Sequence, residues 1–243
     1  MILRIVLFYV LTFLFTVVLG GAQEATGVAA GWLTLPQLAP GLAALVMLLL
    51  FRRDGLRLSL GMPAGPRLLL ALLAAPAVAA AVYLAWRPAP GELPVSLWLL
   101  LPGMAIGAFG EELGWRGYLH RRIDARLSPL VSSVVVGVLW ALWHVGAYQN
   151  GPVYMAFLVL LMVSYSIVLY RLLAGSRFNV WLAAAFHLGI NLGNLPFLGV
   201  INDVSFMGVS AIVWAAIAAV VVIRRRDLFL RAGAPPVAVP ATD

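Results

Sequence analysis

The sequence contains no cysteine and no lysine, and it carries few charges of any kind. Without cysteine the chain has no disulfide, no thiol nucleophile and no thiolate ligand for a metal, and the sequence does not indicate a redox compartment. Charged residues make up 10% of the chain and hydrophobic residues 63%, whereas a soluble globular domain carries about 25% charged residues. With a mean hydropathy of +1.02, the chain has the composition of an integral membrane protein.

All 16 basic residues are arginines, and the formal net charge is +7. A strongly basic chain can bind nucleic acid, but these arginines lie in short clusters between apolar runs. Basic clusters that flank apolar runs are typical of membrane proteins. We therefore expect the lipid bilayer as a partner and no nucleic acid. The sequence does not indicate an oligomeric state.

The apolar runs are continuous, and this pattern predicts membrane-spanning helices, because the strands of a membrane barrel would alternate. Eight runs are separated by Pro, Gly or charged residues; they cover residues 5–19, 28–51, 68–86, 95–123, 129–148, 153–173, 178–195 and 206–223. The sequence thus predicts an all-α fold, a polytopic membrane bundle of about eight transmembrane helices. We expect one domain over residues 1–231 and a disordered tail, rich in Pro and Ala, over residues 232–243.

Eight spans would place both termini on one side of the membrane, and the arginines test this count. Fourteen arginines fall on the terminal side and only Arg87 falls on the opposite side, while Arg116 lies inside the fourth run. Cytoplasmic loops carry an excess of basic residues, so we expect cytoplasmic termini. A chain without Lys that is rich in Ala, Leu and Arg suggests a bacterial inner membrane. Removal of the first run as a signal peptide would take away one span, so the uneven distribution of the arginines also argues against it.

The fourth run contains three charges close together, namely Glu111, Glu112 and Arg116. A charge at the centre of a bilayer costs about 2.5–3.5 kcal/mol, so three of them indicate a functional site. Residues four apart share a helix face, which predicts a pair between Glu112 and Arg116, whereas Glu111 points about 100° away and stays free. The run, residues 95–123, is 29 residues long, so we expect it to tilt, to project or to break near its Pro-Gly pair, residues 102–103.

Four glycines, at positions 107, 110, 114 and 117, repeat every three or four residues along the same run. This spacing puts them on one face of a helix, where the absence of side chains lets the backbone of neighbouring elements come close. We therefore expect other helices to bring side chains to Glu111.

Two more polar pairs lie inside apolar runs at a spacing of four residues, Trp140 with His144 and His187 with Asn191. Each pair shares a helix face. These histidines could be satisfied core residues that hold helices together, but polar residues on three helices of a small bundle favour a shared site. His120 lies beside two arginines at the end of the fourth run, so we expect it at the membrane interface and outside the site.

The pattern Glu-Glu-x-x-x-Arg, then aromatic-x-x-x-His, then His-x-x-x-Asn, each in its own membrane helix, resembles the CAAX-protease and bacteriocin-processing (CPBP) family of intramembrane endopeptidases. The resemblance covers residues 95–195. It implies that Glu111 and His144 activate a water molecule, while His187 and Asn191 stabilise the oxyanion of the tetrahedral intermediate.

The resemblance also implies that Glu112 and Arg116 shape the site. The family usually has Phe where this chain has Trp140, and often Phe where it has Trp115. Because both replacements are aromatic, we expect them to change the size of the pocket more than its chemistry.

Two alternatives to metal-free hydrolysis stay open. Glu111, His144 and His187 could bind a zinc ion, although the chain has no His-Glu-x-x-His helix and Asn191 is a better hydrogen-bond donor than zinc ligand. The family also includes members assigned to bacteriocin immunity or membrane regulation, so the chain could be a non-catalytic binding partner. For an endopeptidase without a cofactor, we expect a membrane-associated peptide or protein as substrate. We expect the site to open on the arginine-rich, cytoplasmic face.

Overall fold

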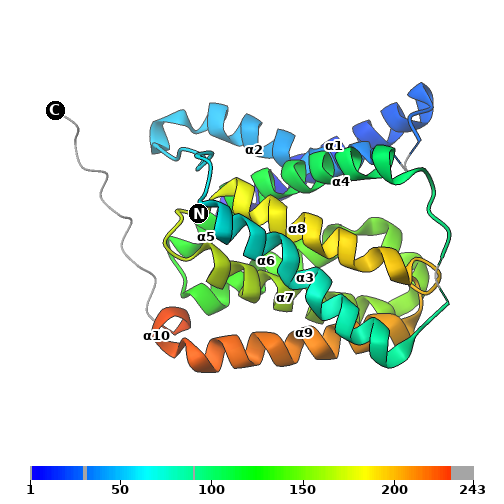
Figure 1. Ribbon diagram of the computed structural model, residues 1–243. Helices are drawn as coiled ribbons and strands as arrows, with labels where there is room; N and C mark the ends of the chain where they lie inside the picture. Colours follow the sequence, from blue (N-terminus) through cyan, green and yellow to red (C-terminus); the bar gives the residue numbers. More distant parts are fainter. Residues whose placement is uncertain (1, 30–31, 90, 231–243) are drawn as a thin grey trace.

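The computed structural model describes residues 2–29, 32–89 and 91–230, and the regular structure within these ranges is helical (Figure 1). The predicted all-α membrane bundle is confirmed, while the predicted tail at residues 232–243 lies outside the described residues. The α-helices are α1 (Ile2–Thr26), α2 (Ala39–Leu50), α3 (Gly65–Trp86), α4 (Leu97–Glu112), α5 (Arg121–Asp124), α6 (Pro129–Trp143), α7 (Gly151–Leu173), α8 (Val180–Asn194), α9 (Val204–Arg224) and α10 (Arg226–Phe229). Turns of 3-10 helix cover Leu35–Leu38, Arg52–Asp54, Val145–Asn150 and Leu195–Phe197.

Each of the eight predicted apolar runs overlaps one of the longer helices. Within the described residues, four helical segments are long and apolar enough to cross a membrane by themselves, namely Ile2–Thr26, Gly65–Trp86, Val145–Leu173 and Val204–Arg224. α2 has 12 residues and α6 has 15, fewer than the roughly 20 that the hydrocarbon core requires. The number of membrane spans therefore stays a prediction.

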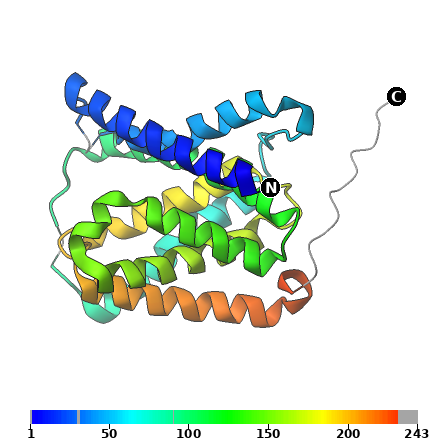
Figure 2. The same cartoon turned by 180° about the vertical axis from the view of Figure 1, so that it is seen from behind.

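The helices form one bundle, with α1, α2 and α4 along one side and α9 along the opposite side (Figures 1 and 2). α8 packs against α3 and α4, and α7 packs against α6 and α9. Buried hydrophobic side chains from most of these helices form a single core. The fourth and seventh apolar runs, which carry the Glu-Glu pair and the His187–Asn191 pair, therefore lie next to each other.

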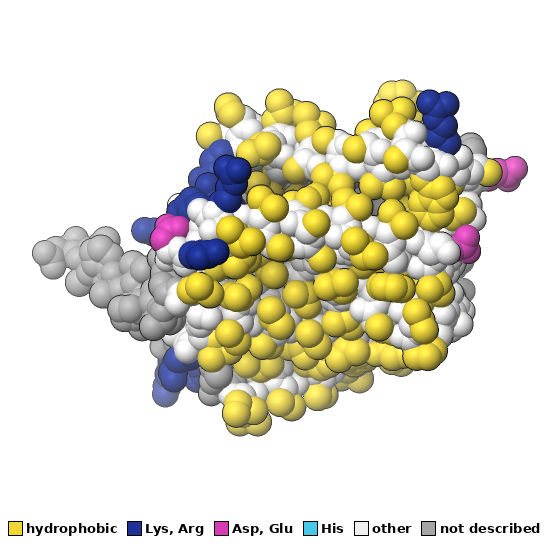
Figure 3. Space-filling model, turned by 90° about the horizontal axis from the view of Figure 1, so that it is seen from below, with side chains coloured by type: hydrophobic (Ala, Val, Ile, Leu, Met, Phe, Trp, Pro, Cys, Tyr) yellow, Lys and Arg dark blue, Asp and Glu magenta, His cyan; other side chains and the backbone are white. Residues whose placement is uncertain are grey.

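The arginine-rich connections gather at one end of the bundle. Figure 3 shows most of the basic side chains at this end and a broad hydrophobic surface along the molecule. Asp54 contacts both Arg4 and Arg122, with 2.9 Å between Asp54 Oδ2 and Arg122 Nη2. Arg87 follows α3 at the other end. We refer to these as the arginine-rich end and the arginine-poor end.

The fourth run does not break near residues 102–103, because α4 continues through Pro102 to Glu112. Pro102 lies near the start of α4, where it removes a single hydrogen bond and the helix can continue. The irregularity lies further along, where Leu113–His120 winds as a π-helix before α5. Such wide turns are frequent at functional sites. This one begins directly after the two adjacent glutamates.

The glycine face of the fourth run receives the segment that leads into α2. A methyl group on Gly107 would overlap the side chain of Gln37, and one on Gly114 would overlap the backbone of Pro40. The close approach that the glycine spacing predicts is thereby confirmed. It brings Gln37, from a distant part of the sequence, up to Glu111.

Candidate active site

Glu112 and Arg116 form a fully buried ion pair, which confirms the predicted pairing. Arg116 Nη1 donates to Glu112 Oε1 at 2.8 Å, and both side chains are 0% exposed. Arg116 Nη2 donates to Ser166 Oγ on α7 at 3.1 Å, and the guanidinium carbon lies 4.2 Å from the centre of the Trp140 ring on α6. One arginine thus links three helices around the second carboxylate of the Glu-Glu pair.

His187 on α8 contacts the same carboxylate. Its Nδ1 lies 2.9 Å from Glu112 Oε1, and the residue is 5% exposed. An ionised carboxylate only accepts hydrogen bonds, so Nδ1 carries the proton in this contact, and Nε2 can donate as well only when the ring is protonated. A protonated His187 together with Arg116 would balance the charges of Glu111 and Glu112, which a buried cluster requires.

Glu111 is held at both carboxylate oxygens and is not the free group that the sequence predicts. Gln37 Nε2 donates to Oε1 at 3.0 Å, and Trp140 Nε1 donates to Oε2 at 2.9 Å. Glu111 is 2% exposed. Each oxygen of a carboxylate has a further lone pair. The two donors therefore fix the orientation of Glu111 and leave it able to accept a proton.

These two donors, Gln37 and the indole N–H of Trp140, are the parts of the site that the sequence analysis does not identify. The exchange of Phe for Trp140 suggests only a change in pocket size, yet the indole makes a hydrogen bond that Phe cannot make. Gln37 is an isolated amide in the apolar run over residues 28–51. A lone polar group inside a membrane segment indicates function. This is the sequence signal by which Gln37 could have been found.

The sequence predicts His144 inside a helix that reaches residue 148. In the structure α6 ends at Trp143, and His144 directly follows it. Its Nδ1 lies 2.8 Å from the backbone carbonyl oxygen of Trp140. A carbonyl oxygen only accepts, so Nδ1 bears the proton, and Nε2 of the neutral ring keeps its lone pair. His144 thus offers a proton acceptor, and it is close enough to Glu111 for an electrostatic interaction.

The ring of Trp140 lies among three of the four predicted catalytic side chains. Its centre is 5.9 Å from the centre of the His144 ring and 5.3 Å from that of His187, while its N–H is bonded to Glu111. Glu111 also interacts electrostatically with His187. The structure therefore brings Glu111, His144 and His187 together from three parts of the sequence. Their catalytic roles stay predictions.

A cavity of about 230 Å³ lies beside this cluster, and Gln37 and Asn191 are among its lining residues. The lining also includes Pro94, which precedes α4, and Ile201, which follows α8. Both of these residues belong to connections at the arginine-poor end (Figure 1). The predicted opening on the arginine-rich face is therefore wrong.

Tight packing explains why the site does not open at the arginine-rich end. Trp115, Tyr118, Leu119 and His120 follow Glu111 towards that end, and all four are 0% exposed. The expectation of an opening on the arginine-rich face follows the distribution of the arginines along the sequence. It does not account for side chains that fill the space in between.

The zinc alternative requires Glu111, His144 and His187 around one ion. In the part of the chain that the structure describes, no three His, Asp or Glu side chains are grouped closely enough to hold a metal ion. Both oxygens of Glu111 and Nδ1 of His187 have partners within the protein. The arrangement of these donors therefore does not fit a three-residue zinc site.

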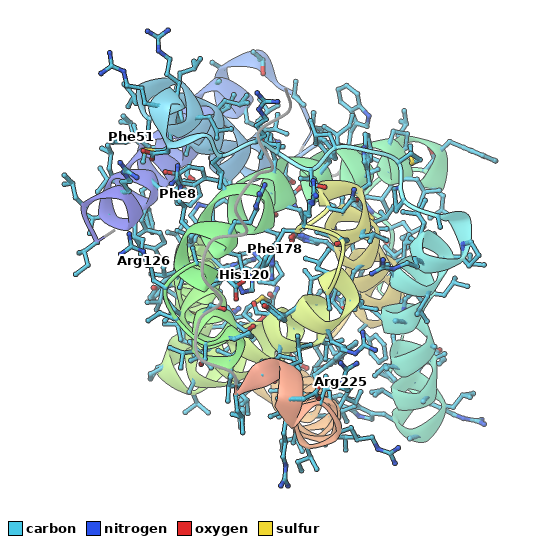
Figure 4. All side chains as sticks on the ribbon, turned by 90° about the vertical axis from the view of Figure 1, so that its left-hand side faces the viewer. Phe8, Phe51, His120, Arg126, Phe178 and Arg225 are labelled. Carbon is cyan, nitrogen blue, oxygen red and sulfur yellow. The ribbon has the colours of Figure 1, made fainter. Side chains whose placement is uncertain are left out.

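His120 is buried and does not lie at the membrane interface as predicted. It is 0% exposed, its Nε2 lies 3.3 Å from Ser132 Oγ, and its ring centre lies 5.1 Å from that of Phe178. Figure 4 shows His120 and Phe178 inside the bundle, whereas Arg126 and Arg225 lie at its edge. The π-helical stretch ends at His120 and directs the side chain inward, so the arginines that follow do not indicate its environment.

Comparison with known proteins agrees with the resemblance found in the sequence. Residues 93–193 match the family described as type II CAAX prenyl endopeptidase, Rce1-like. Lysostaphin resistance protein A of Staphylococcus epidermidis is 27% identical over 210 residues, which cover 81% of this chain and 54% of that protein. The protein of the same name from Staphylococcus aureus is 25% identical over 231 residues, 89% of this chain and 55% of that protein. The chain thus spans about half the length of these relatives.

The matches confirm the predicted resemblance to the CPBP family, of which lysostaphin resistance protein A is a member. The matched residues, 93–193, include Glu111, His144, His187 and Asn191. Gln37 lies outside the matched stretch. Together with the long apolar helices, the similarity to a family of membrane proteases identifies the chain as a membrane protein.

Proposed function

We propose that this chain is an intramembrane endopeptidase that hydrolyses a peptide bond in a membrane-associated peptide or protein, without a metal cofactor. The observation that carries the proposal is the geometry around Glu111, a buried carboxylate fixed at both oxygens and placed next to two histidines. The similarity to a family of endopeptidases supports it. We place the protein in the bacterial cell membrane with both termini in the cytoplasm, following the arginine distribution.

In the proposed reaction, Glu111 and His144 remove a proton from a water molecule as its oxygen bonds to the carbonyl carbon of the substrate. The carbonyl oxygen becomes an oxyanion, which accepts hydrogen bonds from His187 and Asn191. The C–N bond then breaks as the leaving nitrogen takes up the proton. One water is consumed, and the products are a carboxylic acid and an amine. Nε2 of His144 fits the first step, and a protonated His187 fits the second.

The proposal is tested by replacing Glu111 with Ala in a bacterial strain that produces this protein. The N-termini of membrane and secreted proteins are compared between this strain, the wild type and a deletion strain. We expect the same uncleaved precursor to accumulate in the Glu111→Ala and deletion strains. A phenotype in the deletion strain that Glu111→Ala does not reproduce would favour the alternative, a non-catalytic role in immunity or membrane regulation, as the name of the lysostaphin resistance relatives suggests.

Trp140→Phe tests whether the indole N–H orients the catalytic carboxylate. The variant keeps an aromatic ring beside Arg116 but loses the bond to Glu111, and a hydrogen bond to a charged group is worth about 1.5–3 kcal/mol. We expect turnover to fall at least about tenfold, with wild-type amounts of folded protein. Trp143→Phe is the matched control, since it loses an indole bond to Thr16 Oγ1 instead. Equal losses of turnover in both variants would contradict the orienting role.

A further inference from the structure

We propose that the cavity at the arginine-poor end is the substrate cleft, and that it takes an uncharged internal segment of a peptide chain from the extracytoplasmic side. This inference rests on the proposed endopeptidase function. It is carried by the connection between the cavity and Glu111, by the chemistry of the cavity lining and by the end of the bundle at which the cavity lies.

The cavity leads to the reacting groups. Gln37, which donates to Glu111, and Asn191, the proposed oxyanion donor, both line it. Its volume of about 230 Å³ far exceeds the roughly 10–15 Å³ that one water molecule needs. A second cavity, between α3 and α9, has only about 20 Å³ and is lined by neither Gln37 nor Asn191. Of these two cavities, the larger can therefore admit part of a peptide to the site.

The lining determines which peptide segments fit. Among the described residues that line the cavity, none is charged. Trp32, Leu100 and Met104 supply apolar surface, while the amides of Gln37 and Asn191 can both donate to and accept from a peptide backbone. A charged side chain or a free C-terminal carboxylate would lose its hydration there and find no charged side chain among the lining residues. The lining thus selects a neutral segment within a chain over a charged chain end.

The position of the cavity determines the side of access. Pro94 and Ile201 line it at the arginine-poor end, and Trp32, another lining residue, is 41% exposed. A half-exposed Trp is typical of the membrane–water interface. Because the arginine-rich end is expected in the cytoplasm, the substrate segment reaches the cleft from outside.

The absence of cysteine makes the side of access testable by labelling. Leu198→Cys, in the cavity lining, and Arg126→Cys, at the opposite end, are produced separately in intact cells and treated with a membrane-impermeant maleimide. We expect Leu198→Cys to react in intact cells and Arg126→Cys to react only after the membrane is opened. If Leu198→Cys reacts only after opening, the proposed side is wrong.

The cleft itself is tested by filling it. Met104→Trp places a large ring in the cavity, whereas Ile106→Trp places the same ring on a 47% exposed position of the same helix. We expect cleavage of the precursor to slow about tenfold or more for Met104→Trp, because small displacements at a site cost large factors in rate. Ile106→Trp should match the wild type. Equal rates in the two variants would overturn the assignment of the cleft.

Two further measurements keep the outcomes separate. Modification of Leu198→Cys by a bulky maleimide should slow cleavage, and it cannot disturb folding because the protein is already folded when it reacts. Unchanged cleavage by the modified protein would also overturn the assignment of the cleft. Sequenced cleavage sites should lie in uncharged segments on the outer side; cleavage beside charged residues would overturn the neutral selection. If Glu111→Ala accumulates no precursor, the proposed function fails, while the labelling pattern still decides the side on which the cavity opens.

Discussion

An Arg116→Leu variant is expected to yield little folded protein. Arg116 is the partner of a fully buried carboxylate, and it donates to Glu112 and to Ser166. Its removal leaves the carboxylate of Glu112 in the bundle with its contact to His187. Stranding one partner of a buried pair typically costs about 3–5 kcal/mol, a large share of the roughly 5–15 kcal/mol by which proteins are stable.

The measurement is the amount of monodisperse protein after extraction in mild detergent, together with its Tm. Glu111→Gln should resemble the wild type, because an amide has the same shape and its oxygen can still accept from Trp140, while Gln37 can turn its own amide so that its oxygen accepts from the new NH2 group. Arg225→Leu is the control for loss of an arginine, since Arg225 pairs with Asp227 at an exposed position, and such surface pairs contribute little to stability. If Glu111→Gln lost folded protein and Arg116→Leu did not, the structural and catalytic carboxylates would have to be exchanged.

A double variant sharpens this test. Adding Glu112→Gln to Arg116→Leu removes one of the stranded charges, and replacing a whole buried pair by neutral groups costs much less than removing one partner. We expect the double variant to recover part of the folded protein that Arg116→Leu loses. A further decrease would indicate that Glu112 stabilises the bundle through His187 and not through Arg116.

The sequence predicts the parts of this structure that depend on local pattern. Continuous apolar runs locate the helices, and spacings of four residues predict the Glu112–Arg116 pair, which the structure confirms. The glycine spacing predicts a face open to close approach, but not which segment approaches. That choice depends on packing between distant parts of the chain, so the contact of Gln37 with Glu111 cannot be predicted from either run alone.

The wrong predictions for His120 and for the opening of the site also arise because packing between distant parts of the chain is not visible in the sequence. His120 stands next to arginines in the sequence, yet the π-helical stretch, whose hydrogen bonds no residue spacing reveals, ends at this residue and places it in the core. α6 ends at Trp143, so His144 lies at the end of its helix that points away from Arg126. Neither the π-helical turns nor the end of α6 at Trp143 is visible in the pattern of apolar residues. The side on which the site opens is therefore a property of the tertiary structure.

The proposed catalytic pair, Glu111 and His144, leads to the largest expected effect on activity. Glu111→Gln and His144→Gln should each lower kcat by about 10²–10⁴, the range typical of general acid–base groups, with little change in KM. The reason is that in the proposed reaction both groups act on one proton of one water, so neither is sufficient alone. The measurement is the initial rate of cleavage of the precursor in detergent or in lipid discs, at matched amounts of folded protein.

The double variant Glu111→Gln/His144→Gln decides whether the two residues work as a unit. Residues that serve the same step show strongly non-additive losses, so we expect the double variant to be no slower than the worse of the two single variants. Losses that multiply would mean that Glu111 and His144 act in separate steps, and His144 would then have to be assigned to the leaving group or to substrate binding. A wild-type protein that loses activity to a chelator and regains it with zinc would instead favour the metal alternative, with both residues as ligands and an arrangement of donors different from the one seen around Trp140.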